Sequence, residues 1–339
     1  TESASNPTVS TNPSALGTRF INTTSGELFV CTDITAGENF WKGQLGSRVE
    51  PPDFLGDRGV WMGGYDGSAV DDTIDYITIA SLGDAIDFGD VTVAGSRVGQ
   101  GLSSGRRGVC NNYSSSDAQM DYITFATTGN SADFGDLTSA RAPSGVSNGT
   151  RGCWGGGSSS SDTIDYITIA TTGDAVDFGN LTDGRSTCGS LSNETRGLWC
   201  GGSAPSYSTI IDYINIASAG DATDFGDIIS TNSYMGGCSN GTRGIFTGGG
   251  ASPGQINRIQ YVTIDTTGDA VDFGDLTSAR HSTSLVSDGT KGVAGLGYAV
   301  QAAAVVNILD YVNIASLGDA SDFGDLTRTG SGAHACSGD

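Results

Sequence analysis

The stretch TIDYITIATTGDAVDFGNLT (163–182) decides the fold, because five similar stretches occur in the same 339-residue chain. Residues 73–92 read TIDYITIASLGDAIDFGDVT, and residues 259–277 read IQYVTIDTTGDAVDFGDLT. The tyrosine of the stretch recurs in steps of 46, 44, 47, 48 and 50 residues, at Tyr76, Tyr122, Tyr166, Tyr213, Tyr261 and Tyr311. Such a period is typical of a fold assembled from repeated supersecondary units. We number these repeats units one to six.

Each unit contains four segments with the character of β-strands. TIDYITIA alternates β-branched or aromatic residues with others at a period of two, TTGDA is a turn, and VDFGNLT is a second short strand. The stretch RSTCGSLSNETRGLWCGG (185–202) predicts two further strands joined at a turn, where other units carry the hairpin signals Asn-Gly or Asp-Gly. Four strands in about 47 residues predict the blade of a β-propeller.

The two ends of the repeat region are complementary. Unit one begins at DRGVWMGG (57–64) and lacks the first of the four strands, whereas the last residues, SGAHACSGD (331–339), match that missing strand. Pairing 331–339 beside 57–64 removes two open sheet edges. We therefore predict an all-β fold, a six-bladed β-propeller closed by this pairing, with a small N-terminal β extension.

The repeat resembles the kelch motif. Kelch units carry an arginine after the previous blade's last strand, a double glycine at the end of the second strand, a tyrosine in the third and a tryptophan in the fourth. The matching arginines here are Arg97, Arg141, Arg185 and Arg280. Phenylalanine replaces the tryptophan, and unit two has CNNY where the double glycine belongs. The resemblance covers about residues 57–339. It implies the fold but says little about function, because kelch-like propellers serve many roles.

Residues 1–50 lie outside the repeat. Residues 12–43 predict a strand, a turn at NTTSGE and a second strand. This segment resembles a short module of structural proteins of tailed bacteriophages, especially marine ones, at Gly17, Thr18, Phe20, Asn22, Thr23, Gly26, Phe29, Val30, Cys31, Thr32, Asp33, Thr35, Ala36, Gly37, Asn39 and Trp41. The repeats likewise resemble repeats of phage virion and appendage proteins. The resemblance implies an anchor segment at 1–50, a linker at 51–56 and a propeller at 57–339.

The charge balance excludes some partners. With 16 basic and 38 acidic residues the net charge is −22, which repels nucleic acid and anionic membrane surfaces. No apolar run has the length of a bilayer span, so we expect no membrane insertion. The polar first residues lack the apolar core of a secretory signal.

The seven cysteines are predicted to be free and buried. Cys238 and Cys153 occupy positions that other units fill with valine, leucine or isoleucine, which is the behaviour of a small core residue. The chain has no CxxC motif or Cys/His cluster that would indicate zinc.

Carboxylates three apart around a turn raise the alternative of bound calcium. The five weak candidates are Asp84, Asp87, Asp90, Asp174 and Asp177. The calcium-loop pattern D-x-D-x-D-G is absent, and an aspartate at a turn commonly caps its own backbone. We therefore expect no cofactor, with calcium as the alternative.

A basic residue precedes glycine at the same place in every unit. These residues are Arg58, Arg107, Arg151, Arg196, Arg243 and Lys291. We predict that they lock neighbouring blades together by charge-assisted hydrogen bonds to aspartates. Lys291 lacks the forked guanidinium, so unit six should have the weakest lock.

The sequence offers little for catalysis, and we predict no catalytic residues. The only histidines, His281 and His334, lie at positions that other units fill with Ala142, Ser186 or Tyr234. An active site needs different groups converging on one point, which a repeat with few singular polar residues does not supply. The variable loops at 201–210 and 297–308, with Tyr207 and Tyr298, are the predicted partner contacts.

The leading hypothesis is a non-catalytic virion protein, a decoration or appendage of a phage head or tail that serves particle assembly or host-surface adhesion. Its expected location is the virion or the extracellular space. Its expected partners are other virion proteins, through residues 1–50, and a host cell-surface glycan or protein; an oligomer is compatible with this role. The second hypothesis is a secreted or cell-surface carbohydrate- or protein-binding propeller. The third, an enzyme of galactose-oxidase or glycosidase type, lacks a catalytic set.

Overall fold

The computed structural model describes residues 2–3, 7, 11, 13–33, 40–43, 48–49, 56–95, 99–112, 117–203, 206–251, 254–299 and 301–339. The chain divides into two compact units, Thr1–Pro52 and Asp53–Asp339. This division falls within the predicted linker, 51–56, of which only Gly56 lies among the described residues.

The described strands of the N-terminal compact unit form a five-stranded sheet. Its strands, in sheet order, are β1 (Glu2–Ser3), β2 (Arg19–Asn22), β3 (Leu28–Asp33), β4 (Phe40–Gly43) and β5 (Arg48–Val49). The turn predicted at residues 22–27 joins β2 to β3, and the Asn22 side-chain oxygen accepts the Thr24 and Ser25 backbone N–H groups at 2.8 and 3.1 Å. Among the described residues of this unit, the buried side chains that pack together are Phe20, Phe29, Cys31 and Trp41.

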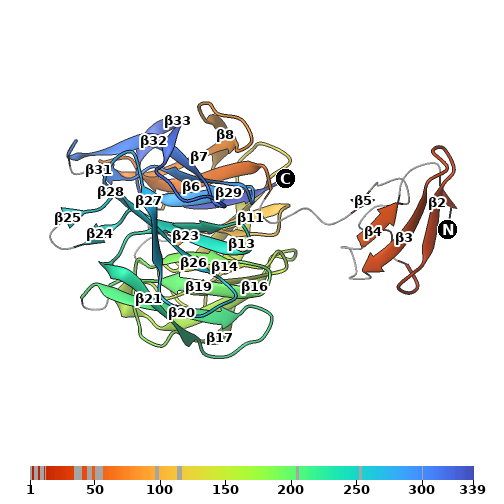
Figure 1. Cartoon of the computed structure of the whole chain (residues 1–339), viewed down its shortest axis with the longest axis horizontal. Helices are drawn as coiled ribbons and strands as arrows, with labels where there is room; N and C mark the ends of the chain where they lie inside the picture. The colour runs from red at the N-terminus through yellow and green to blue at the C-terminus, as the bar shows by residue number, and fades with distance from the viewer. Residues whose placement is uncertain are drawn as a thin grey trace. The chain divides into compact units, whose positions relative to one another are not determined.

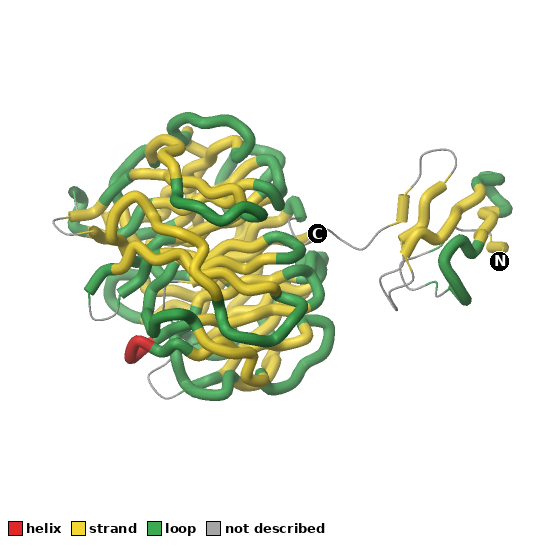
Figure 2. Tube along the Cα trace, turned by 60° about the horizontal axis from the view of Figure 1, so that its bottom comes forward, coloured by secondary structure: helices red, strands yellow, loops and turns green. Residues whose placement is uncertain are grey.

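The larger compact unit is all-β and is built mainly of four-stranded antiparallel sheets, as Figures 1 and 2 show. Unit one supplies β6 (Arg58–Tyr65), β7 (Val70–Thr78) and β8 (Ile86–Asp90). Unit two supplies β9 (Gly99–Gln100), β10 (Leu102–Ser103), β11 (Arg107–Asn111), β12 (Gln119–Thr124) and β13 (Ala132–Asp136). Unit three supplies β14 (Ser144–Ser147), β15 (Arg151–Gly155), the short 3-10 helix η1 (Ser158–Ser160), β16 (Thr163–Thr168) and β17 (Val176–Asn180).

The remaining units repeat this arrangement with additions in the loops. Unit four supplies β18 (Gly189–Ser192), β19 (Arg196–Cys200), β20 (Ser208–Asn215) and β21 (Thr223–Asn232). Unit five supplies β22 (Gly236–Ser239), β23 (Arg243–Thr247), β24 (Gly250–Ala251), β25 (Gly254–Gln255), β26 (Arg258–Thr263) and β27 (Val271–Asp275). Unit six supplies β28 (Arg280–His281), β29 (Ser284–Ser287), β30 (Lys291–Gly295), β31 (Tyr298–Ala299), β32 (Ala304–Asn313) and β33 (Ser321–Gly330), and β34 (His334–Gly338) follows.

The strand β34 joins the sheet of unit one. It pairs antiparallel with β6, and Cys336 lies opposite Val60. The segments that the sequence matched with each other, 331–339 and 57–64, are therefore neighbours in one sheet. The first strand of unit two is split, because β9 pairs in parallel with β34 whereas β10 pairs with β11.

The DFG motif forms a β-bulge. In unit three, Ile164 pairs with Gly179 and Asp165 pairs with Asp177, which leaves Phe178 as the extra residue. The bulge turns the phenylalanine toward the tyrosine of the neighbouring strand. All six units contain this ring pair edge to face, with centroids 5.8–6.2 Å apart.

The turn TTGDA of each unit binds the DFG strand of the unit before it. In unit three the Gly173 N–H donates to the Phe134 carbonyl at 2.7 Å, and the Ala175 N–H donates to the Asp136 carbonyl at 2.8 Å. The Asp174 carboxylate accepts the Asp136 N–H at 3.1 Å. We call this set of hydrogen bonds the inter-unit clasp.

The clasp occurs at six junctions. Its glycine-to-phenylalanine hydrogen bonds, all 2.7–3.0 Å, join Gly83 to Phe323, Gly129 to Phe88, Gly173 to Phe134, Gly220 to Phe178, Gly268 to Phe225 and Gly318 to Phe273. The repeated sequence is therefore complementary to itself, since one part of each copy binds another part of its neighbour.

The clasp predicts a specific role for the glycine of DFG. Gly135 has φ +135°, and a Cβ there would lie 2.5 Å from the Gly173 carbonyl carbon, whereas Gly173 has φ +154° and nothing within 4 Å of its own Cβ position. Both alanine variants carry backbone strain of about 1–3 kcal/mol. Gly135→Ala should lose a further 1–3 kcal/mol or so by steric overlap. Urea unfolding measures both free energies, and equal losses for the two variants would contradict the clasp.

Candidate functional site

The six basic residues of the RG motif contact the next unit. Arg151 donates to the Ile216 and Ala217 carbonyl oxygens at 3.1 and 3.0 Å, and its guanidinium carbon lies 4.5 Å from the centroid of the Tyr166 ring. The other residues of this set that donate to carbonyls of another unit are Arg58, Arg107, Arg196, Arg243 and Lys291. The prediction that these residues bind aspartates is wrong: their acceptors are backbone carbonyls.

Lys291 reaches from unit six to unit one. Its ammonium donates to the Ile79 and Ala80 carbonyl oxygens at 3.1 and 2.8 Å. The amine thus makes two hydrogen bonds without the fork of an arginine. This contact spans more than two hundred residues of sequence, because the neighbour of unit six is the first repeat.

The five calcium candidates lie in the last strand of a unit or in the turn before it. Asp84 and Asp174 accept backbone N–H groups in the clasps, Asp84 from Asp325 at 3.0 Å. Asp87 and Asp177 are exposed on the bulged strands, and Asp90 is half-buried there. Among the described residues, no group of three or more His, Cys, Asp or Glu side chains is placed to hold a metal ion.

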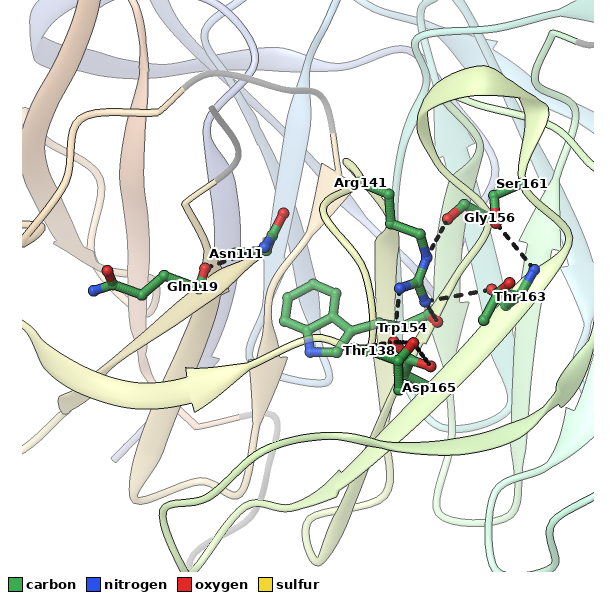
Figure 3. Close-up of polar contacts among 9 residues, drawn as sticks. All are labelled: Asn111, Gln119, Thr138, Arg141, Trp154, Gly156, Ser161, Thr163 and Asp165. Carbon is green, nitrogen blue, oxygen red and sulfur yellow. Dashed lines mark hydrogen bonds and ion pairs between the residues drawn. The ribbon is translucent and has the colours of Figure 1, made fainter. Parts of the chain in front are cut away.

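A buried ion pair joins the segment that leads into a unit to the tyrosine strand of that unit, as Figure 3 shows for unit three. The Arg141 guanidinium lies 2.6 Å from the Asp165 carboxylate and also donates to the Gly156 and Trp154 carbonyls, each at 3.0 Å. Thr138 donates its hydroxyl to the same carboxylate at 2.8 Å. Two further pairs have the same form, Arg185 with Asp212 at 2.8 Å and Arg280 with Asp310 at 2.9 Å.

Sequence reasoning identified these arginines through the kelch resemblance and missed their partners. The signal was present, because an acidic residue precedes the tyrosine in units one to four and in unit six. Arg97, the remaining kelch-type arginine, lies outside the described residues.

Unit five replaces both ions of the pair with amides. Asn232 takes the arginine position and donates to the Gly248 carbonyl at 2.9 Å. Gln260 takes the aspartate position and accepts the Ile229 N–H at 2.9 Å. The paired substitution removes two buried charges together, which avoids leaving one of them uncompensated.

Unit one has a looser version of the pair. Arg328 does not occupy the position in the repeat that Arg141, Arg185 and Arg280 share. It lies 3.7 Å from the Asp75 carboxylate. The Thr327 hydroxyl donates to the same carboxylate at 2.5 Å. Burial raises the pKa of Asp75, while the hydrogen bond from Thr327 and the charge of Arg328 lower it.

The amide pair of unit five suggests a stability test in unit four. Arg185→Asn should cost about 3–5 kcal/mol, because it leaves the Asp212 carboxylate buried without its partner. Arg185→Asn combined with Asp212→Gln should recover more than half of that loss. Urea unfolding gives the free energies. The control Arg258→Asn, in an exposed pair with Asp272 at 3.9 Å, should cost less than about 1 kcal/mol. A double variant no more stable than Arg185→Asn alone would refute this account.

A narrow cavity lies among the first strands of all six units. Its volume is about 60 Å³, enough for a few water molecules but not for a metabolite. Six equivalent serines line it, Ser103, Ser147, Ser192, Ser239, Ser287 and Ser337. Their hydroxyls link neighbouring units; Ser192 donates to the Ser147 carbonyl at 2.8 Å, and Ser103 donates to the Ser337 carbonyl at 2.5 Å.

Gln100 contributes to this cavity from unit two. Its side-chain amide donates to the Gly237 and Leu285 carbonyls, the latter at 2.7 Å, and its oxygen accepts the Leu285 N–H at 3.2 Å. One side chain therefore ties unit two to units five and six. The sequence contained no signal for this contact, which depends on the arrangement of the units.

His334 is a buried structural residue. It is 4% exposed, and its ring packs edge to face on Trp154 with centroids 5.8 Å apart. Within the described part of the chain neither ring nitrogen has a hydrogen-bond partner. Burial lowers the pKa of His334 to about 4, and the nearby backbone of Gln100 and Asn111 offsets only part of that effect.

This low pKa predicts acid sensitivity. The unfolded histidine binds a proton near its ordinary pKa of 6.5 and the folded one only near 4, so protonation favours unfolding as the pH falls between these values. The loss at pH 4 should be about 3 kcal/mol. His334→Ser, which copies the serine that units three and six carry at this position, should remove that part of the slope. Urea unfolding from pH 7 to pH 4 tests this, and parallel curves for the two proteins would contradict it.

The six cysteines of the larger compact unit are free and buried, as predicted, and Cys31 is buried in the N-terminal sheet. Burial raises the pKa of Cys153 to about 12 and also raises that of the Cys200 thiol. Thiols with raised pKa values are poor nucleophiles at neutral pH. These cysteines are therefore core residues.

The two predicted partner loops belong to different units, four and six. Tyr207 is 37% exposed and precedes β20. Tyr298 is half-buried in β31, where its ring stacks on His281 with centroids 5.5 Å apart and an interplanar angle of 21°. The ring of Tyr234 lies on His281 at 5.4 Å and 45°. Sequence reasoning missed Tyr234 as a member of this aromatic cluster.

Comparison with known proteins adds no assignment: no protein-family model matches the chain, and a search of curated proteins found no similar one. Within the described ranges, no helix has the length and apolar character needed to cross a membrane.

Proposed function

We propose that residues 57–339 form a closed, six-bladed, kelch-like propeller and that the protein is a non-catalytic component of a phage virion. The observation that carries the architecture is the recurrence of one set of contacts at six junctions. Two of these contacts join the last repeat to the first: the clasp from Gly83 to Phe323 and the Lys291 hydrogen bonds to Ile79 and Ala80. The pairing of β34 with β6 adds the fourth strand to the sheet of unit one.

A scaffold role accounts for the motifs that recur. The aspartates, arginines and glycines of the repeat take part in clasps, ion pairs and carbonyl contacts between units. The cavity on the proposed axis has a volume of only about 60 Å³ and is crossed by the side chain of Gln100. Neither feature offers the converging set of different groups that catalysis uses.

The virion assignment rests on the phage-like N-terminal segment and repeats. In this proposal residues 1–50 attach the protein to other virion proteins, and the propeller serves decoration of the particle or adhesion to the host surface. The alternative is a secreted or cell-surface binding propeller, which would use the same scaffold. The aromatic cluster of Tyr234, His281 and Tyr298 suits the adhesive form of either role.

Particle composition tests the virion proposal. Quantitative mass spectrometry of phage particles purified from the source community or host should detect the chain in a fixed ratio to the major capsid protein, because a structural component has a defined copy number. A phage protein made only inside the cell serves as the negative control. Absence from washed particles, or a ratio that varies between preparations, would overturn the assignment.

A further inference from the structure

Three aromatic side chains meet where units five and six adjoin. Tyr234 precedes β22, His281 belongs to β28 and Tyr298 belongs to β31; β28 pairs with β31, and Figure 1 places both strands near β24 and β25. All three side chains are half-buried. His281 lies between the two tyrosine rings, 5.4 Å from Tyr234 and 5.5 Å from Tyr298 between centroids. We call these three residues the aromatic shelf.

The shelf residues are larger than most of their counterparts in the repeat. Backbone hydrogen bonds align Tyr234 with Thr187, Ser282 and Gly332, because each of these residues bonds to the next across neighbouring units. The neighbouring positions align His281 with Ser186, Ser233 and Ser331. Tyr298 follows the second glycine of its unit and aligns with Ser158, Ser203, Gly250 and, in unit one, Tyr65. Apart from Tyr65 these counterparts are small or hydroxylated, so the described repeats bring three rings together at one junction.

Tyr234 also occupies a backbone conformation that disfavours it. Its φ is +60°, a region in which a bulky residue costs on the order of 1–3 kcal/mol. The aligned Thr187, Ser282 and Gly332 have φ +56°, +59° and +67°, so this conformation belongs to the position in the repeat. The ring cluster, rather than the backbone conformation, therefore distinguishes this junction from the others.

The chemistry of the shelf favours a neutral, hydroxylated ligand. Burial lowers the pKa of His281, so its ring is uncharged at neutral pH, and the net charge of −22 repels anions. The rings offer apolar surface with polar edges, and the Ser282 hydroxyl lies 2.8 Å from the His281 ring nitrogen Nδ1. No hydrogen bond of the Tyr234 or Tyr298 hydroxyl is formed within the described part of the chain. A sugar ring has the matching form, an apolar C–H face and a rim of hydroxyls.

We propose that the aromatic shelf of Tyr234, His281 and Tyr298 binds a neutral sugar ring of a glycan. The sugar stacks its C–H face on the tyrosine rings, and the tyrosine hydroxyls bind its hydroxyl groups. This inference deepens the adhesive part of the proposed function and rests on it for its biological setting. The three-ring arrangement belongs to one junction, because Tyr65, the counterpart of Tyr298 in unit one, pairs with Ser331 instead of a histidine.

Saturation-transfer-difference NMR on the full chain tests the site. The probes are methyl β-galactopyranoside, methyl β-glucopyranoside and N-acetylglucosamine, with adenosine as a planar aromatic comparison. At least one sugar should give a signal strongest at its ring C–H protons. Tyr298→Ala should weaken binding about tenfold through loss of the stacking partner.

A second variant tests the site while keeping every ring. A Cβ at Gly250 would lie 3.9 Å from Tyr234 Cδ2 and 4.0 Å from His281 Cδ2, so Gly250→Val should cover the shelf and also weaken binding. Tyr65→Ala removes the counterpart of Tyr298 in unit one, which pairs with Ser331, and should leave the signal unchanged. Thermal unfolding verifies that each variant is folded.

Three outcomes would contradict sugar binding at the aromatic shelf. They are no signal from any sugar with folded protein, equal signals in the wild type and both shelf variants, or a response to adenosine alone. None of them affects the particle measurement, which tests virion membership separately. A chain that binds sugar but is missing from particles would instead support the secreted or cell-surface alternative.

Discussion

The inter-unit clasp is the interaction on which the rest of the structure depends. A four-stranded sheet exposes two faces and two edges, and each repeat here covers part of this surface with a neighbour. The clasp does so mainly through backbone atoms, since the Gly173 and Ala175 N–H groups bind carbonyls of the preceding strand. The glycine of DFG allows the close approach, because a side chain at Gly135 would overlap the Gly173 backbone.

The ion pairs and the contacts of the RG residues with carbonyls add side-chain interactions to this backbone framework. Buried pairs such as Arg141 with Asp165 contribute little net stability over an apolar substitute, but removal of one partner is costly. Unit five is consistent with this principle, because Asn232 and Gln260 changed together and each amide found a backbone partner. The repeat therefore tolerates a different pair chemistry as long as both members change.

The sequence predicted the elements more completely than their contacts. The period, the turns and the four strands per unit could be read from residue types, because these features are local. The acceptors of the RG residues could not, since a backbone carbonyl such as that of Ile216 has no signature in the sequence. The buried aspartates could have been found by comparing units, because Gln260 and Asn232 depart from the pattern together. Gln100 and the three shelf residues needed the fold, as their partners come from distant segments.

The pairing of β34 with β6 has a consequence for biosynthesis. The sheet of unit one gains its remaining strand only after the other described strands have been made, because β34 is the last of them. Until then Val60, opposite Cys336, lacks a cross-strand neighbour on that side, and β6 presents an open edge that is prone to wrong pairing. Completion of the first repeat therefore requires an encounter between the two ends of the repeat region.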